Sequence, residues 1–271
     1  PARASPDGRQ IAAATADASV AIFETETGTR TRTLGKLGNV GTIRWSPDGH
    51  RVAAMTASGS VSVWDRDGRL VRALPGPNLA GALIAFSNDG KWLARSGEPA
   101  DTLFALDGGS DRKLLEAEHQ GAALVVAFSP DDKTVLVAGL GFLSTWDIAT
   151  AAPRVRIATN GFITAAAFFA GGAYVIAGGP DRRMHVWNAD SGAEVLAFTV
   201  PAQPRKIAID PSGRRIAVLA GRTAVIWSVP AFQGTLEALR ERARCSLDLE
   251  VVDAHLRARS IDLTACSRAA W

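Results

Sequence analysis

The fold is decided by residues 42–65, which read TIRWSPDGHRVAAMTASGSVSVWD. Two runs rich in β-forming residues, Thr42–Trp45 and Arg51–Met55, flank the tetrapeptide Ser46-Pro47-Asp48-Gly49. Proline presets φ, aspartate bonds to nearby backbone and glycine tolerates positive φ, so the tetrapeptide predicts a tight turn. Strand, turn and strand together predict a β-hairpin.

This hairpin recurs at a fixed period. Copies of the turn, some of them degenerate, begin at residues 5, 46, 87, 129, 169 and 210, so their spacings are 41, 41, 42, 40 and 41 residues. After each turn comes an alternating strand that in most copies ends in an aromatic residue, such as Val61 to Trp64, followed by a turn and a fourth strand. Four short strands in each period of about 40 residues predict the blades of a β-propeller.

Two further marks identify a family. Trp64-Asp65 and Trp146-Asp147 are Trp-Asp dipeptides at the ends of third strands, and Asp17 and Asp181 stand six residues before Phe23 and Trp187. With these marks, residues 4 to about 230 resemble WD40 repeats. The resemblance implies that the two aspartates hold blade turns and that one tryptophan per blade packs in the core: Trp64, Trp146, Trp187 and Trp227. TolB-like propellers also repeat Ser-Pro-Asp-Gly, but the third-strand tryptophan favours WD40.

We therefore expect an all-β, WD40-like propeller with six visible repeats over residues 1–230 and a small mixed tail over 231–271. Pro1 to Ala4 cover the end of an opening strand, so the first blade is truncated. Seven blades, one supplied upstream, are the expected closure; six blades, with another segment filling the last outer strand, are the alternative. In the tail we predict a helix over 235–244 and then a short strand, both packing on the propeller as in the tails of bacterial multidomain proteins.

Composition argues against several classes of function. The net charge is +3, and the basic residues are scattered, so nucleic acid is not the expected partner. No apolar run is long enough to span a bilayer. The four histidines and two cysteines lack metal-ligand spacing, and nucleotide-binding and nucleophile motifs are absent from the sequence. We expect no cofactor, no metal, no enzymatic activity and a cytoplasmic location, with Cys245 and Cys266 reduced or, alternatively, joined as a disulfide.

Binding in WD40 proteins commonly uses the face made by the links between blades and by the turns between second and third strands. Basic and aromatic residues are enriched at such interfaces. The candidates on this face are Lys36, Asn39, His119, Phe162, Arg182, Arg183, Arg205 and Arg222.

The expected function is that of a non-catalytic, protein-binding sensor or scaffold module. Arginine far outnumbers lysine, and alanine and glycine are abundant, which is typical of a GC-rich bacterial genome. By resemblance the module belongs to a larger bacterial signalling or defence protein, and its partner is a protein or the remainder of its own polypeptide. The alternative is a small-ligand-binding or enzymatic propeller with a site in the central channel. Ala, Gly and Val stand where the first strands are expected to meet the propeller axis, and these small residues favour the protein-binding hypothesis.

Overall fold

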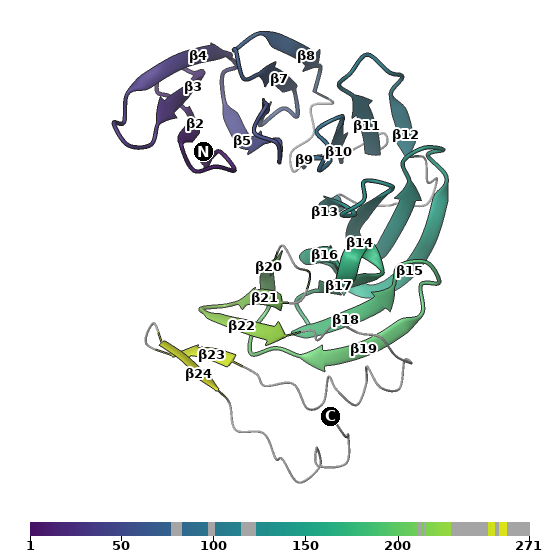
Figure 1. The fold of residues 1–271 in the computed structure, drawn as a ribbon. Helices are drawn as coiled ribbons and strands as arrows, with labels where there is room; N and C mark the ends of the chain where they lie inside the picture. Colours follow the sequence, from purple (N-terminus) through teal and green to yellow (C-terminus); the bar gives the residue numbers. More distant parts are fainter. Residues whose placement is uncertain are drawn as a thin grey trace. The chain divides into compact units, whose positions relative to one another are not determined.

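The computed structural model describes residues 1–76, 83–96, 101–114, 123–210, 213, 215–228, 249–252 and 255–258. His119, both cysteines and the helix predicted over 235–244 lie outside these residues. The described part is all-β, as predicted, with a short 3-10 turn at Ala170–Gly172 (Figure 1). It contains no helix that is long and apolar enough to cross a bilayer.

The strands form six antiparallel sheets, and each sheet is built from consecutive segments of the chain (Figure 1). This confirms the six-fold repeat. The first sheet contains β1 (Ala2–Ala4), β2 (Gln10–Ala14), β3 (Ser19–Glu24) and β4 (Arg30–Lys36). The second contains β5 (Val40–Trp45), β6 (Arg51–Thr56), β7 (Val61–Asp65) and β8 (Leu70–Leu74). The third contains β9 (Ile84–Phe86), β10 (Trp92–Arg95), β11 (Asp101–Ala105) and β12 (Arg112–Leu114).

The last three sheets follow the same order. They are β13 (Ala123–Phe128), β14 (Thr134–Asp147) and β15 (Pro153–Phe162); β16 (Ala165–Phe169), β17 (Tyr174–Gly178), β18 (Arg183–Asn188) and β19 (Glu194–Thr199); and β20 (Pro204–Ile209), β21 (Arg215–Ala220), β22 (Thr223–Ser228), β23 (Leu249–Val252) and β24 (His255–Ala258). In the sixth sheet, β23 comes from the tail and pairs with β22, with Leu249 opposite Ile226.

The long strand β14 folds back on itself. The backbone N–H of Ile148 donates to the carbonyl of Lys133 at 2.9 Å. An extended strand rises about 3.3 Å per residue, so a straight β14 would hold these two residues far apart. The reversal falls near Gly141, whose φ of 77° is left-handed. The fourth sheet therefore also contains the second and third segments of a four-segment blade.

The chain divides into two compact units. Unit 1 comprises Pro1–Phe128, Asp132–Val137 and Trp146–Pro153, and unit 2 comprises Ser129–Asp131, Ala138–Thr145 and Arg154–Trp271.

In unit 1 the core lies between neighbouring sheets. Val52 and Ala54 of β6 pack in a cluster with the first sheet, whereas Ala53 and Met55 pack in a cluster with the third. Successive side chains of a strand point to opposite faces, so β6 is apolar at every one of these positions because both of its faces are buried. In unit 2 a third cluster joins the fifth and sixth sheets, with Met184 and Val218 fully buried in it.

The repeated turn has the geometry that its sequence predicts. The hydroxyl of Ser46 is fully buried, donates to Asp48 Oδ1 at 2.5 Å and accepts from the backbone N–H of Arg51 at 2.8 Å. Gly49 has a φ of 71°. The same bonds recur around Ser5 and Ser87. These three turns therefore close by local side-chain hydrogen bonds, which makes their period recognisable in the sequence, whereas the fifth copy folds as the 3-10 turn Ala170–Gly172 without a side-chain cap.

Candidate partner-binding surface

Two kinds of connection lie at the same end of each sheet. In an antiparallel four-stranded meander, the turn between the second and third strands and the link to the next sheet leave from one end, which we call the connection end. Backbone hydrogen bonds join the two: Ala57 donates to Asn39 at 2.9 Å in unit 1, and Val200 donates to Arg182 at 2.8 Å in unit 2. The turns at the other end, including the Ser-Pro-Asp-Gly copies, form the hairpin end.

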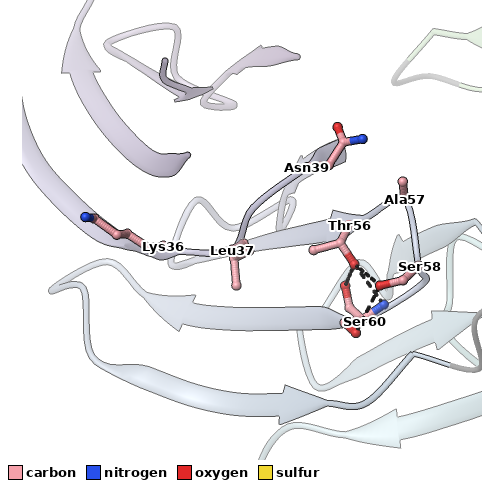
Figure 2. A pocket seen from close by; sticks show the side chains of 7 residues that line it. All are labelled: Lys36, Leu37, Asn39, Thr56, Ala57, Ser58 and Ser60. Carbon is pink, nitrogen blue, oxygen red and sulfur yellow. Dashed lines mark hydrogen bonds between the residues drawn. The ribbon is translucent and has the colours of Figure 1, made fainter. Parts of the chain in front are cut away.

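The connection end of unit 1 contains a cavity of about 450 Å³ between the β4–β5 link and the β6–β7 turn. Figure 2 shows the hydroxyls of Thr56, Ser58 and Ser60 gathered on one side, with Lys36 at the end of β4 and Asn39 in the link. Thr56 Oγ1 lies 2.9 Å from Ser58 Oγ and accepts from the N–H of Ser60 at 3.1 Å. The cavity is lined by Lys36, Leu37, Asn39, Thr56, Ala57, Ser58 and Ser60.

The corresponding turn of the first sheet is closed by Asp17. Its carboxylate accepts from Thr15 Oγ1 at 2.5 Å, from Ser19 Oγ at 2.7 Å and from the N–H of Ser19 at 3.2 Å. Arg30 forms an ion pair with it at 3.7 Å. The hydrogen bonds from Thr15 and Ser19 hold the pKa of Asp17 well below its usual value. The ionised Asp17 therefore stabilises this turn through its Oδ1, which accepts all three hydrogen bonds.

Unit 2 closes the equivalent turn differently. Asp181 accepts from the N–H of Arg183 at 3.0 Å, but Gly179 stands where unit 1 has Thr15 and Thr56. A Cβ atom on Gly179 would lie 2.0 Å from the carbonyl oxygen of Phe162. Glycine is required here because the β15–β16 link passes directly over the turn.

The predicted cations of unit 2 are all exposed. Arg182 and Arg183 lie in the β17–β18 turn and at the start of β18, Arg222 lies in the β21–β22 turn, and Arg205 lies at a register shift in β20. Such a bulge redirects a side chain out of the regular strand pattern. Arg182 adopts a left-handed φ of 61°.

Sequence reasoning missed part of this surface. Leu140 in the reversal of β14 is 43% exposed, and Phe162, which was predicted, is 47% exposed. The backbone N–H of Ile163 donates to Gly139 at 2.9 Å, so the two apolar residues come from hydrogen-bonded segments. The signal for Leu140 was its place between Gly139 and Gly141, since a leucine in a two-glycine turn has no strand to pack against.

The aromatic residues assigned to the blades pack inside. Trp64, Trp146 and Trp187 are buried, and Trp227 is partly buried against the unit 2 cluster, edge-on to Phe198 with ring centroids 4.7 Å apart. Trp187 stacks on His185 at 5.4 Å. Among the described residues, the buried Nε1 of Trp146 has no hydrogen-bond partner.

The described residues contain no group of three or more His, Cys, Asp or Glu that could hold a metal ion. The first strands of unit 1 also carry charge, because Arg3 lies on β1 and Arg44 on β5. Burial, followed by the neighbouring charge of Arg3, lowers the pKa of Arg44.

Comparison with known proteins agrees with this architecture. The family model of the WD domain, G-beta repeat (WD40) matches residues 28–65 and 154–188, each of which covers the last strand of one sheet and the first three of the next. These two segments of the chain therefore match the WD40 repeat. No curated protein sequence matches it.

Two solved structures show the same propeller fold. One is a chain from the crystal structure of a mitotic checkpoint complex, with a TM-score of 0.69 and 18% identity, covering 84% of this chain and 75% of that one. The other is the C-terminal WD40 domain of Sif2, with a TM-score of 0.69 and 18% identity, covering 84% of this chain and 66% of that one. At this identity the likeness establishes the fold of these WD40 repeats and leaves their partner to be argued from the surface.

Proposed function

We propose that this WD40 propeller is a non-catalytic protein-binding module that serves as a sensor or scaffold in a larger, cytoplasmic bacterial signalling or defence protein. The observation that carries the proposal is the composition of the connection ends. They hold an open cavity with exposed Lys36 and Asn39 in unit 1, and exposed cations beside exposed apolar residues in unit 2. Arginine and aromatic side chains supply much of the binding energy at protein interfaces.

The hairpin ends support the same view by contrast. The serine and aspartate side chains of the repeated turns there are occupied in closing those turns, as Ser46, Asp48 and Ser87 show. Groups that are fully used within the fold offer little to a partner. The solved structure of a mitotic checkpoint complex is that of an assembly, which is consistent with a propeller of this fold meeting other proteins.

The test is affinity capture with the full-length parent protein, followed by mass spectrometry. The combined variant Lys36→Ser, Asn39→Ser, Arg182→Gly and Arg222→Ser removes four exposed side chains from the connection ends. A partner retained by the wild type and by a hairpin-end variant, but lost by the connection-end variant, supports the proposal. A wild type that retains no protein yet gains thermal stability from a small molecule overturns it.

One observation favours the small-ligand alternative. Arg3 and Arg44 lie on neighbouring first strands, and Arg44 is partly desolvated, an arrangement that suits a small anion. If this is the functional site, pyrophosphate raises the melting temperature of the wild type but not that of Arg44→Met. Equal shifts in the two proteins, or none, remove the alternative.

A further inference from the structure

The connection end of unit 2 concentrates positive charge. The side chains of Arg182, Arg183, Arg205 and Arg222 are exposed, and none of them makes an ion pair or hydrogen bond with another described residue. Among the described residues of this end, Asp181 is the sole carboxylate, and it already accepts the N–H of Arg183. We call these four arginines, together with Phe162 and Leu140, the basic end.

Backbone contacts bring these residues onto adjoining elements. Val200 donates to the carbonyl of Arg182, and Pro204 pairs with Ala220 across β20 and β21. Arg205 follows Pro204 directly, and Arg222 follows Ala220 by two residues. The chain therefore presents the arginines from two consecutive turns and from the link between their sheets.

The apolar part is attached to the same turns. The carbonyl of Phe162 lies against Gly179, three residues before Arg182, and the link after Phe162 is hydrogen bonded to Gly139. Large apolar side chains close to half exposed are costly to leave in water and mark contact sites when they are grouped. Phe162 and Leu140 thus provide apolar contact area beside unpaired cations.

The charge is not a general property of unit 2. Among the described residues of its hairpin end, Asp131, Asp190, Glu194 and Asp210 outnumber Arg154 and Arg215, and Glu194 lies 3.4 Å from His185. A partner that senses the electrostatic potential of this unit is therefore oriented toward the basic end.

We infer that the basic end binds an acidic segment of a partner protein that also carries an aromatic or aliphatic side chain. This inference rests on the proposed protein-binding function. Carboxylates on the segment would accept hydrogen bonds from the arginines, whose planar guanidinium groups suit carboxylates. The apolar side chain would contact Phe162 and Leu140. Nucleic acid is disfavoured, because the exposed aliphatic side chain of Leu140 contributes nothing to phosphate binding.

The experiment is a selection from a display library of random peptides of about 12 residues on the whole chain. The test variant combines Arg182→Gly, Arg205→Ser and Arg222→Ser. Arg182→Gly keeps the left-handed backbone that Gly59 adopts in the equivalent turn of unit 1, with φ 81°. The control variant Arg66→Ser, Arg69→Ser and Arg215→Ser removes the same charge from exposed positions at hairpin ends.

We expect the enriched peptides to combine several Asp or Glu residues with a Phe, Leu or Ile. The test variant should bind the best of them about tenfold more weakly, and the control variant about as well as the wild type. Added salt should weaken wild-type binding. Replacement of the peptide's apolar residue by Ala should also weaken it.

Four outcomes overturn the inference. If the enriched peptides lack acidic residues, or if the test variant binds them as well as the wild type does, the basic end is not a binding site for an acidic segment. Peptides lost only on Lys36→Ser and Asn39→Ser place binding at the unit 1 cavity, so that the inference fails while the proposed function stands. No peptide enrichment, with a single-stranded oligonucleotide bound and then lost on the test variant, makes both fail.

Discussion

The two units close equivalent turns by different means. In unit 1, the Thr56 hydroxyl accepts from the backbone N–H of Ser60 in the β6–β7 turn, and the Asp17 carboxylate accepts from Ser19 in the corresponding turn of the first sheet. In unit 2, the β17–β18 turn replaces the threonine with Gly179, and Arg182 takes the left-handed position. Side chains that close a turn are not free to bind a partner. In the β17–β18 turn of unit 2, Arg183 contributes its backbone N–H to closing the turn, and its side chain remains exposed.

Exchanging the key residue between the turns gives the largest expected effect. Gly179→Thr forces a side chain onto the Phe162 carbonyl, so we expect a loss of about 3 kcal/mol in the free energy of unfolding. Thr56→Gly, the reverse exchange, removes hydroxyl hydrogen bonds but creates no clash, and should cost about 1 kcal/mol. Urea denaturation of both proteins measures the difference, and equal losses would show that the units do not differ at these turns.

A pair of alanine substitutions, one in each unit, tests the turns at the hairpin ends. Ser46→Ala leaves the N–H of Arg51 without its buried side-chain acceptor, which should cost about 2 kcal/mol. Asp210→Ala removes the 2.8 Å bond to the N–H of Arg215 at a more exposed turn of unit 2, and about 1 kcal/mol is expected. Urea denaturation measures both free energies of unfolding. A larger loss of stability for Asp210→Ala than for Ser46→Ala would contradict this prediction.

Acid should act through the carboxylates of unit 1. The pKa of Asp17 and that of Asp7 are lowered from 3.8 mainly by hydrogen bonds from neighbouring hydroxyls and backbone. A carboxylate whose pKa is lower in the folded state stabilises the fold fully above its ordinary pKa, and the effect is lost as the pH falls toward the folded value. Between about pH 5 and pH 3, the wild type should therefore lose more stability than Asp17→Asn. Urea denaturation at both pH values measures this, and an equal drop in the urea midpoint for the wild type and for Asp17→Asn would refute the prediction.

The smallest effect is expected at Arg182. A non-glycine residue at φ 61° is strained, so Arg182→Gly should leave stability unchanged or raise it by up to about 1 kcal/mol. Thermal unfolding measures the change. A clear destabilisation would mean that the Arg182 side chain supports the turn, as Thr56 and Asp17 support the turns of unit 1.

Much of the fold was legible in the sequence because the turns are local. Ser46, Asp48 and Gly49 carry their own closing bonds, so their period predicted the hairpins and the six sheets. The surface was harder to predict, because it depends on contacts between distant segments. Nothing in the sequence places the Phe162 carbonyl on Gly179, or Arg3 close enough to affect Arg44. The predicted residue types at the connection ends follow from topology, but the cavity beside Lys36 and the exposure of Leu140 do not.

The matched repeat and the folded sheet are out of phase, and this has a consequence for how such a chain can change length. Residues 28–65 contain β4 of the first sheet together with β5 to β7 of the second. Removing a whole repeat would bring β8 into the place of β4, so the joined sheet would still have four strands. Loss or duplication of a segment between repeat boundaries therefore changes the number of blades and leaves a four-strand blade at the junction. Loss of a segment between sheet boundaries also removes one complete blade, but every remaining blade keeps its own fourth strand.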